Sequence, residues 1–107
     1  MSRKIVAFDE LAFESAAELK WLLSCRCEVE FIWKGKAYSI THFGGHHCIC
    51  EGHYLKDGKA YNLLSNTEYD ISNMLESDDL DEIMNFEIEG DKIRDIATKI
   101  GVVDRTL

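Results

Sequence analysis

Apolar and polar residues alternate most regularly between Cys27 and Tyr54, and this stretch predicts three antiparallel strands in a meander. Along residues 27–33 every second side chain is apolar, and glutamates belong to the other face. Lys34-Gly35 then stands where a two-residue turn is needed. The resulting cross-strand pairs are Trp33 with Lys36, Phe31 with Tyr38, Val29 with Ile40, and Cys27 with His42. Because apolar side chains face apolar side chains in this arrangement, the pattern fixes the register of the hairpin.

Glycines mark the turns that follow this hairpin. Gly44-Gly45 accepts positive φ at both positions and predicts a turn into a third strand around Ile49. A two-residue turn there sets His42 opposite His47, whereas a slip of one residue sets Cys48 in that position. Residues 56–59 are a second turn signal, Lys-Asp-Gly-Lys, and residues 60–64 predict a fourth strand.

Two segments have the pattern of amphipathic helices. Ser15-Ala16-Ala17-Glu18 is a capping box, in which the Ser15 hydroxyl accepts from the Glu18 amide and the Glu18 carboxylate from the Ser15 amide. The apolar stripe that follows it is Ala16, Leu19, Leu22 and Leu23. A helix from Asp91 to Lys99 has the stripe Ile93, Ile96, Ala97 and Ile100. Gly101 is expected to end this helix, and Val102-Val103 to return to the sheet.

The segment between these helices carries weaker signals. Thr67 is expected to cap a short helix, and Ser77 to cap a further turn. The apolar face of the short helix is Ile71, Met74 and Leu75. Residues 86–88 alternate as a brief strand does. Residues 1–12 have no decisive pattern, although Ile5, Val6 and Phe8 allow a short edge strand.

These elements predict one α+β domain spanning residues 1–107. Its architecture is an antiparallel sheet of three to five strands, with an N-terminal helix and one or two C-terminal helices packed on it. The inner face of the sheet is expected to carry Val29, Phe31, Tyr38 and Ile40. The helices are expected to cover that face with Leu19, Leu22, Ile93 and Ile96.

The start of the chain and its hydropathy indicate a compartment. A basic pair, Arg3-Lys4, is followed by acidic residues before a signal-peptide core of about 7 apolar residues can form. The sequence has no run of about 18 apolar residues, so no membrane span is expected. We therefore expect a cytoplasmic protein whose four cysteines remain reduced.

The net charge of −8 is concentrated in one region, because residues 68–95 contain eleven acidic residues and two basic ones. A nucleic-acid binder needs a basic stripe, and none is visible, so direct binding to DNA or RNA is not expected. The acidic run is either a solvated surface that maintains solubility or a face that meets a basic protein partner. The candidate binding residues in it are Asp78, Asp79, Asp81 and Glu82. Trp21 lies off the centre of its helix stripe, either as a boundary residue or as an anchor for a partner.

Cysteines and histidines around the third strand offer an alternative chemistry. Two Cys-x-Cys pairs, at 25–27 and 48–50, occur with four histidines. The candidate metal ligands are Cys27, His42, His47, Cys48 and Cys50. Structural zinc sites usually separate paired cysteines by two to four residues, so the spacing favours cysteines that pack as small apolar side chains, and no metal or other cofactor is expected. A cysteine nucleophile activated by histidine is the remaining enzymatic hypothesis. The chain carries no phosphate loop, G-x-S-x-G, H-E-x-x-H or calcium loop, so we do not expect an enzyme.

Residues 28–41, Glu-Val-Glu-Phe-Ile-Trp-Lys-Gly-Lys-Ala-Tyr-Ser-Ile-Thr, resemble a hairpin of small uncharacterised bacterial and prophage-encoded proteins. Those proteins combine a short N-terminal helix, an E-x-E-F-x-aromatic-x-G-K-x-Y-S-I hairpin and an ending similar to Asp104-Arg105-Thr106-Leu107. Lys34 stands here where that pattern has asparagine, and the enrichment in cysteine and histidine is not part of the resemblance. The resemblance implies an α+β fold and no particular activity.

The sequence thus leaves two classes of function. The favoured one is a non-enzymatic interaction or accessory protein, of the kind that a mobile element encodes, which binds a protein partner through its acidic face or a sheet edge. A homodimer through a sheet edge belongs to the same class. The alternative is a metal-binding or thiol-dependent protein that uses the cysteine and histidine cluster.

Overall fold

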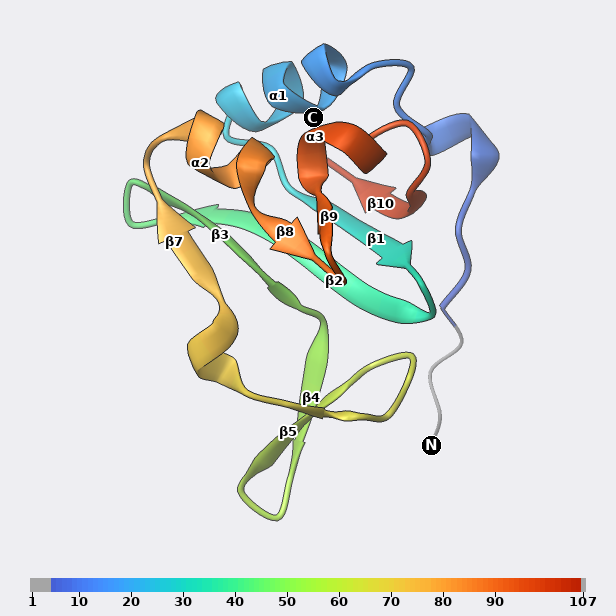
Figure 1. Cartoon of the computed structure of the whole chain (residues 1–107), viewed down its shortest axis with the longest axis vertical. Helices are drawn as coiled ribbons and strands as arrows, with labels where there is room; N and C mark the ends of the chain where they lie inside the picture. The colour runs from blue at the N-terminus through green and yellow to red at the C-terminus, as the bar shows by residue number, and fades with distance from the viewer. Residues whose placement is uncertain (1–4, 107) are drawn as a thin grey trace.

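An antiparallel sheet of five strands, in the order β10-β1-β2-β3-β7, is the centre of the fold (Figure 1). The computed structural model describes residues 5–106. The basic pair Arg3-Lys4 and Leu107, the last residue of the 104–107 ending, therefore lie outside the described residues. The strands of this main sheet are β1 (Val29–Trp33), β2 (Lys36–Phe43), β3 (His46–Glu51), β7 (Leu75–Ser77) and β10 (Gly101–Arg105). The predicted α+β class is confirmed.

The register of the β1–β2 pair is the one that the sequence predicts, and of the two registers left open for β2–β3 the structure has the one that a two-residue turn gives. Phe31 pairs with Tyr38 and Val29 with Ile40 in the first, and His42 pairs with His47 in the second. Both residues of each connecting turn have positive φ, as a type I′ turn requires; Lys34 is at 48° and Gly35 at 77°. The expected pair of Cys27 with His42 is wrong as a ladder pair, because β1 begins at Val29.

The α-helices that the structure describes cover one face of the main sheet (Figure 1). They are α1 (Ala16–Ser24), α2 (Leu80–Asn85) and α3 (Ile93–Ile96). The buried cluster between the layers contains every residue expected there: Val29, Phe31, Tyr38 and Ile40 from the sheet, and Leu19, Leu22, Ile93 and Ile96 from the helices. The predicted inner face is therefore confirmed.

Of the two hydrogen bonds of the predicted capping box, one forms at the start of α1. The Ser15 hydroxyl accepts a hydrogen bond from the Glu18 amide at 3.0 Å. The Glu18 carboxylate accepts from the Glu14 amide at 3.4 Å and from Arg105 at 3.1 Å, in place of the expected bond from Ser15. The carboxylate therefore connects the helix start to β10 instead of closing the capping box.

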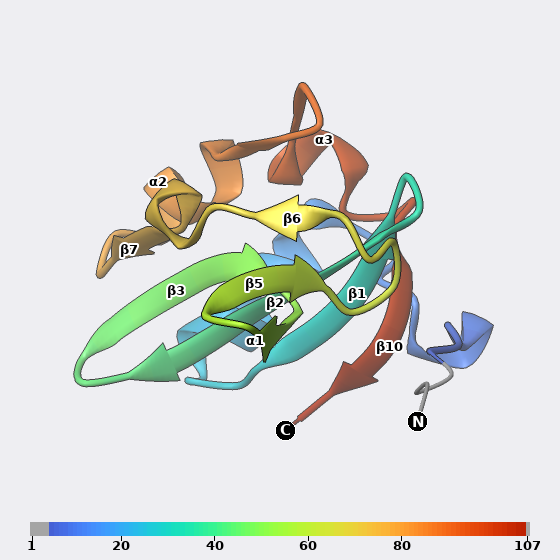
Figure 2. The ribbon, with the colours of Figure 1, turned by 90° about the horizontal axis from the view of Figure 1, so that it is seen from below.

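A second sheet projects from the end of β3, and β5 and β6 cross in front of the main sheet when the molecule is seen from below (Figure 2). It consists of β4 (His53–Lys56), β5 (Lys59–Asn62) and β6 (Glu68–Tyr69), in that order. The expected continuation of the third strand to Tyr54 is therefore wrong, because the chain leaves the main sheet at Gly52. The predicted fourth strand exists as β5, but it pairs with β4 and β6.

Residues 67–77 do not form the predicted short helix. Thr67 precedes strand β6, and the Asp70 carboxylate accepts from the Ser72 amide at 2.9 Å to cap a single 3₁₀ turn, η2 (Ile71–Asn73). Leu75 belongs to β7, where it pairs with Ile49. Although the apolar residues of this segment have helical spacing, the segment therefore forms a strand, because it pairs with β3. Ser77 accepts from the Asp79 amide at 3.0 Å, and Asp79 is the N-cap of α2.

The C-terminal elements are shorter than expected. Strands β8 (Glu87–Ile88) and β9 (Asp91–Lys92) form a hairpin, so α3 begins at Ile93 and not at Asp91. The brief strand and the return of the chain to the sheet in β10 are confirmed. Residues 5–8 form no strand; η1 (Asp9–Leu11) follows them, and the Phe8 amide donates to the Val102 carbonyl on β10 at 2.9 Å. Within residues 5–106, no helix is long and apolar enough to cross a membrane.

Candidate functional site

Trp21 lies on the outer side of α1, where 59% of its surface is exposed. The helix buries Leu19, Leu22 and Leu23 against the sheet, so its 3.6-residue period turns Trp21 toward solvent. Lys20, the preceding residue, forms an ion pair with Asp81 of α2 at 2.8 Å. This contact joins the outer side of α1 to the first turn of α2.

The four candidate acidic residues are all exposed and all belong to the start of α2 or the residues just before it. Asp79 is the N-cap, and its carboxylate accepts from the Asp81 amide at 2.9 Å. The hydrogen bond and charge of Lys20 lower the pKa of Asp81. Negative charge is favoured at a helix N-terminus, so local structure accounts for part of this composition. We call Trp21, Asp78, Asp79, Asp81 and Glu82 together the helical face.

The five candidate metal ligands do not come together in one cluster. Residues alternate between the faces of β3, so His47 belongs with Ile49 on the core side, while Cys48 and Cys50 belong to the opposite face. His42 and His47 stack edge to face with ring centroids 4.9 Å apart. Burial, and to a lesser extent His42, lowers the pKa of His47. Among the residues that the structure describes, no three histidine, cysteine, aspartate or glutamate side chains are arranged to hold a metal ion.

The cysteines are free thiols in different surroundings: Cys27 and Cys48 are buried, Cys50 is half-buried and Cys25 is exposed. Burial raises the pKa of the Cys48 thiol to about 11, which suppresses the thiolate at neutral pH. The Cys50 sulfur lies 3.5 Å from the Ser39 hydroxyl. Both line a cleft of about 270 Å³ on the sheet face away from the helices.

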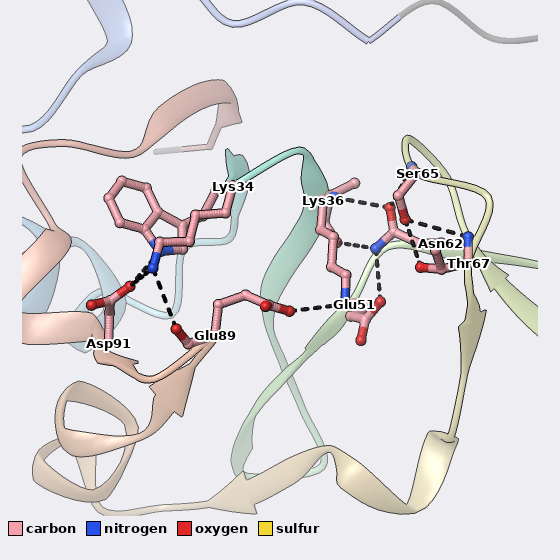
Figure 3. Close-up of polar contacts among 10 residues, drawn as sticks. Lys34, Lys36, Glu51, Asn62, Ser65, Thr67, Glu89 and Asp91 are labelled. Atoms are coloured by element: carbon pink, nitrogen blue, oxygen red, sulfur yellow. Dashed lines mark hydrogen bonds and ion pairs between the residues drawn. The ribbon is translucent and has the colours of Figure 1, made fainter.

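A polar network that the sequence did not reveal joins the β1–β2 turn to the β8–β9 turn (Figure 3). Lys34 pairs with Asp91 and Lys36 with Glu89, each at 2.8 Å. Trp33 also donates its indole N–H to Asp91 at 3.1 Å. The available sequence signal was Glu89-Gly90, which has the X-Gly pattern of the other hairpin turns. Nothing in the local pattern indicates that this turn contacts a hairpin more than fifty residues earlier.

Beside this network lies a second cleft, of about 410 Å³, between the end of β3, η2 and the β8–β9 hairpin. Its lining combines aromatic rings with carboxylates: Tyr38, Tyr69 and Phe86 with Glu51, Glu87 and Glu89, and Ile49, Cys50, Asn73 and Ile88 complete it. We call it the anionic cleft. Sequence reasoning named Tyr38 as an inner-face residue and Cys50 as a candidate metal ligand, but it did not group these residues into a site, because they come from five separate segments of the chain.

Comparison with known proteins found no matching family model and no significantly similar curated protein or solved structure. Function is therefore inferred from the residues of this chain and their geometry.

Proposed function

We propose that this protein is a non-enzymatic interaction protein that binds a basic protein partner through the helical face. The observation that carries the proposal is the contact between Lys20 and Asp81, which joins the helix that carries the exposed Trp21 to the acidic start of α2. Exposed tryptophans are over-represented among the residues that dominate binding energy. Surrounding carboxylates steer a basic partner toward such an anchor.

The charge of the helical face is mostly uncompensated within the described residues. Lys20 pairs with Asp81, whereas Asp78, Asp79 and Glu82 take part in no ion pair within residues 5–106. A basic partner would therefore supply the missing counter-charge. The proposal also includes residence in the cytoplasm. It further includes a role as an accessory factor of a mobile element, which is supported by the resemblance of the hairpin to those of prophage-encoded proteins.

Site-specific photocrosslinking tests the anchor. A photoreactive phenylalanine analogue replaces Trp21 in one variant and Phe43 in a matched control, since Phe43 is also 59% exposed but lies on β2. After irradiation in extract from the native cells, a basic protein should be crosslinked by the Trp21 variant and not by the control. Equal crosslinking at both positions would show that the helical face has no special role.

The captured protein then allows a quantitative test of the carboxylates. Changing Asp78, Asp79, Asp81 and Glu82 to their amides preserves shape, and asparagine at position 79 caps a helix about as well as aspartate. We expect association to slow by about tenfold at low salt and to lose most of its salt dependence. The control changes Glu10, Glu30, Glu68 and Asp104, which are also exposed, to their amides. Equal slowing in both variants would assign the effect to net charge and reject the helical face.

A sheet edge is the second candidate surface, and β4 is the strand that favours it. It is an outer strand of the small sheet, and its residues Tyr54, Leu55 and Lys56 are exposed. An unpaired edge can receive a strand from another molecule, including a second copy of this chain. Sedimentation at increasing concentration tests the homodimer: a shift toward twice the monomer mass, abolished by Leu55→Lys, supports it. A constant monomer mass rejects it.

A further inference from the structure

We propose that the anionic cleft binds an organic cation with an alkylammonium or guanidinium group. The cleft is independent of the helical face, because it is built from the end of β3, β6, η2 and the β8–β9 hairpin. Its volume of about 410 Å³ suits a small ligand or one long side chain. The chemistry of its walls determines which ligand fits.

The charge of the cleft favours a cation. Three carboxylates, those of Glu51, Glu87 and Glu89, line it, and within residues 5–106 no lysine or arginine is among its lining residues. Lys36 reaches Glu89 from β2, with 2.8 Å between the ammonium nitrogen and the carboxylate oxygen. Glu51 accepts a hydrogen bond from the neutral amide of Asn62 at 2.8 Å. Lys34 also approaches Glu89, and its ammonium group donates to the Glu89 carbonyl at 3.4 Å, but Lys34 forms its ion pair with Asp91 (Figure 3). Glu51 and Glu87 take part in no ion pair within residues 5–106, so the cleft keeps an excess of negative charge.

Neighbouring groups respond to this negative field. Burial raises the pKa of the Tyr38 phenol, and the charges of Glu89 and Glu51 raise it further. The hydrogen bond to Glu89 raises the pKa of Lys36 despite the opposing effect of burial. The raised pKa of Lys36 means that its cationic form is stabilised, and the raised pKa of Tyr38 means that its anionic form is disfavoured, as expected near negative charge. Lys36 itself demonstrates that an ammonium group is accepted here.

The aromatic and apolar wall of the cleft suits an organic cation. Tyr38, Tyr69 and Phe86 supply ring surfaces, and Ile49 and Ile88 supply aliphatic contact. A cation gains from a ring face, and an alkyl stem gains from apolar contact, so both parts of such a ligand are matched. A divalent metal ion is disfavoured, because the described residues contain no group of three ligands arranged for it.

An unused polar group in the cleft also points to a ligand. Tyr69 is 6% exposed, and within residues 5–106 its buried hydroxyl has no partner in hydrogen-bonding geometry, although the backbone of Glu51 lies close enough to oppose part of the rise in its pKa. Burial raises the pKa of this phenol to about 12, so it stays protonated at neutral pH. A buried hydroxyl without a partner is uncommon and costly in folded proteins. Tyr69 is among the residues that line the cleft, so a ligand there can offer its hydroxyl a well-aligned hydrogen bond.

The test uses the full chain and two probes of almost equal shape, butylguanidinium and neutral butylurea, at constant ionic strength. Amide chemical shifts in ¹⁵N–¹H spectra report binding by residue. We expect saturable shifts at Asn73, Glu87 and Glu89 with butylguanidinium, with a dissociation constant on the order of 1 mM for so small a ligand. Butylurea should bind at least about tenfold more weakly, because it lacks the charge-assisted contacts.

Two variants make the prediction specific. Glu89→Gln should weaken butylguanidinium binding by about tenfold, whereas Glu30→Gln, an exposed position on the opposite sheet face, should leave it unchanged. Lys36→Met keeps most of the stem and releases Glu89 from its own lysine, so affinity should increase by about threefold or more. A structural defect would not increase affinity. Melting curves of each variant verify that the fold is retained.

Spermidine and the blocked peptide Gly-Arg-Gly distinguish the two sources of such a cation. Tighter binding of spermidine points to a free amine, and tighter binding of the peptide points to an arginine side chain of a protein; both outcomes support the assigned chemistry. Equal binding of butylguanidinium and butylurea would overturn it. So would shifts that stay linear with concentration, an equal effect of Glu30→Gln and Glu89→Gln, or weaker binding by Lys36→Met.

Discussion

Replacing Asn62 by alanine should be among the most damaging polar substitutions in this protein. The side chain is fully buried at 0% exposure and connects the small sheet to β2 of the main sheet. Its carbonyl oxygen accepts from the Ala37 amide at 3.0 Å, and its amide nitrogen donates to the Ala37 carbonyl at 3.0 Å. It thereby imitates the backbone of a neighbouring strand at the point where β3 has turned away (Figure 3).

The size of the effect follows from the bonds that are lost. Asn62 also donates to Glu51 at 2.8 Å and accepts from the Leu64 and Ser65 amides at 2.9 and 3.1 Å. The last two amides are only partly buried, so water can replace the asparagine there. The buried Ala37 amide cannot be hydrated in this way, which costs about 1–3 kcal/mol, and the bond to the Glu51 carboxylate contributes about 1.5–3 kcal/mol. We expect the free energy of unfolding to fall by about 3–5 kcal/mol.

Urea denaturation followed by circular dichroism measures this change. The urea concentration at the midpoint should fall while the m-value stays constant, because stability changes but the surface exposed on unfolding does not. Asn73→Ala is the matched control, since Asn73 is exposed, and it should change the free energy of unfolding by no more than about 0.5 kcal/mol. A loss below about 1 kcal/mol for Asn62→Ala would refute the assignment of Asn62 as the connection between the sheets.

Asn62→Asp separates the hydrogen bonds from the volume of the side chain. The aspartate keeps the acceptor, loses both donors and adds a carboxylate next to Glu51. Each carboxylate then raises the pKa of the other in the folded state. A raised pKa in the folded state means that the folded protein binds protons more tightly than the unfolded chain, so acidification from neutral pH should recover part of the lost stability relative to the wild type. A deficit that does not change with pH would contradict this electrostatic account.

Two further predictions concern the core and one histidine. Phe31→Ala should lower the free energy of unfolding by about 3–5 kcal/mol in urea denaturation, because Phe31 is 1% exposed and stacks on Tyr38, whereas Phe43→Ala, at an exposed position, should have little effect. Similar urea midpoints for the two variants would show that Phe31 does not lie on the buried face of β1. For His47, burial lowers the folded-state pKa below the unfolded value, so the stability that the neutral ring contributes is present above about pH 6.5 and is lost as pH falls through the lower folded value. Stability measured between about pH 7 and 5 should therefore depend less on pH in His47→Gln than in wild type and in the exposed-site control His46→Gln, and equal slopes in all three would show that His47 is not the titrating group.

The sequence by itself determined the elements whose signals are local. The Ser15 cap predicted the start of α1, and the Lys34-Gly35 turn fixed the register of β1 with β2. A two-residue turn and period-2 alternation leave one register that buries the apolar face, so no distant contact is needed to choose it. For this reason the inner face around Phe31 also follows from the alternation of residues alone. For β2 with β3 the Gly44-Gly45 turn left two registers open, and the structure has the one with His42 opposite His47.

Only the tertiary structure decided which of these elements meet. The spacing of Ile71, Met74 and Leu75 suits a helix, but the edge of β3 offers Leu75 a strand pairing with Ile49, and pairing prevails. The same pattern reveals nothing about the contact of Trp33 with Asp91, which are 58 residues apart in the chain. Periodicity encodes which face of an element is apolar, but not which distant element will cover it.

The candidate sites divide in the same way. Exposure of Trp21 follows from the helix stripe, and exposure of the acidic residues at the start of α2 follows from composition and capping. The contact between Lys20 and Asp81, which joins α1 to the start of α2, is a property of helix packing. The anionic cleft was invisible in the sequence, because Tyr38, Tyr69 and Glu89 carry no shared motif. They come together only after β3 has ended and the β8–β9 hairpin has folded over the sheet, since the arrangement depends on long-range packing and not on any local propensity.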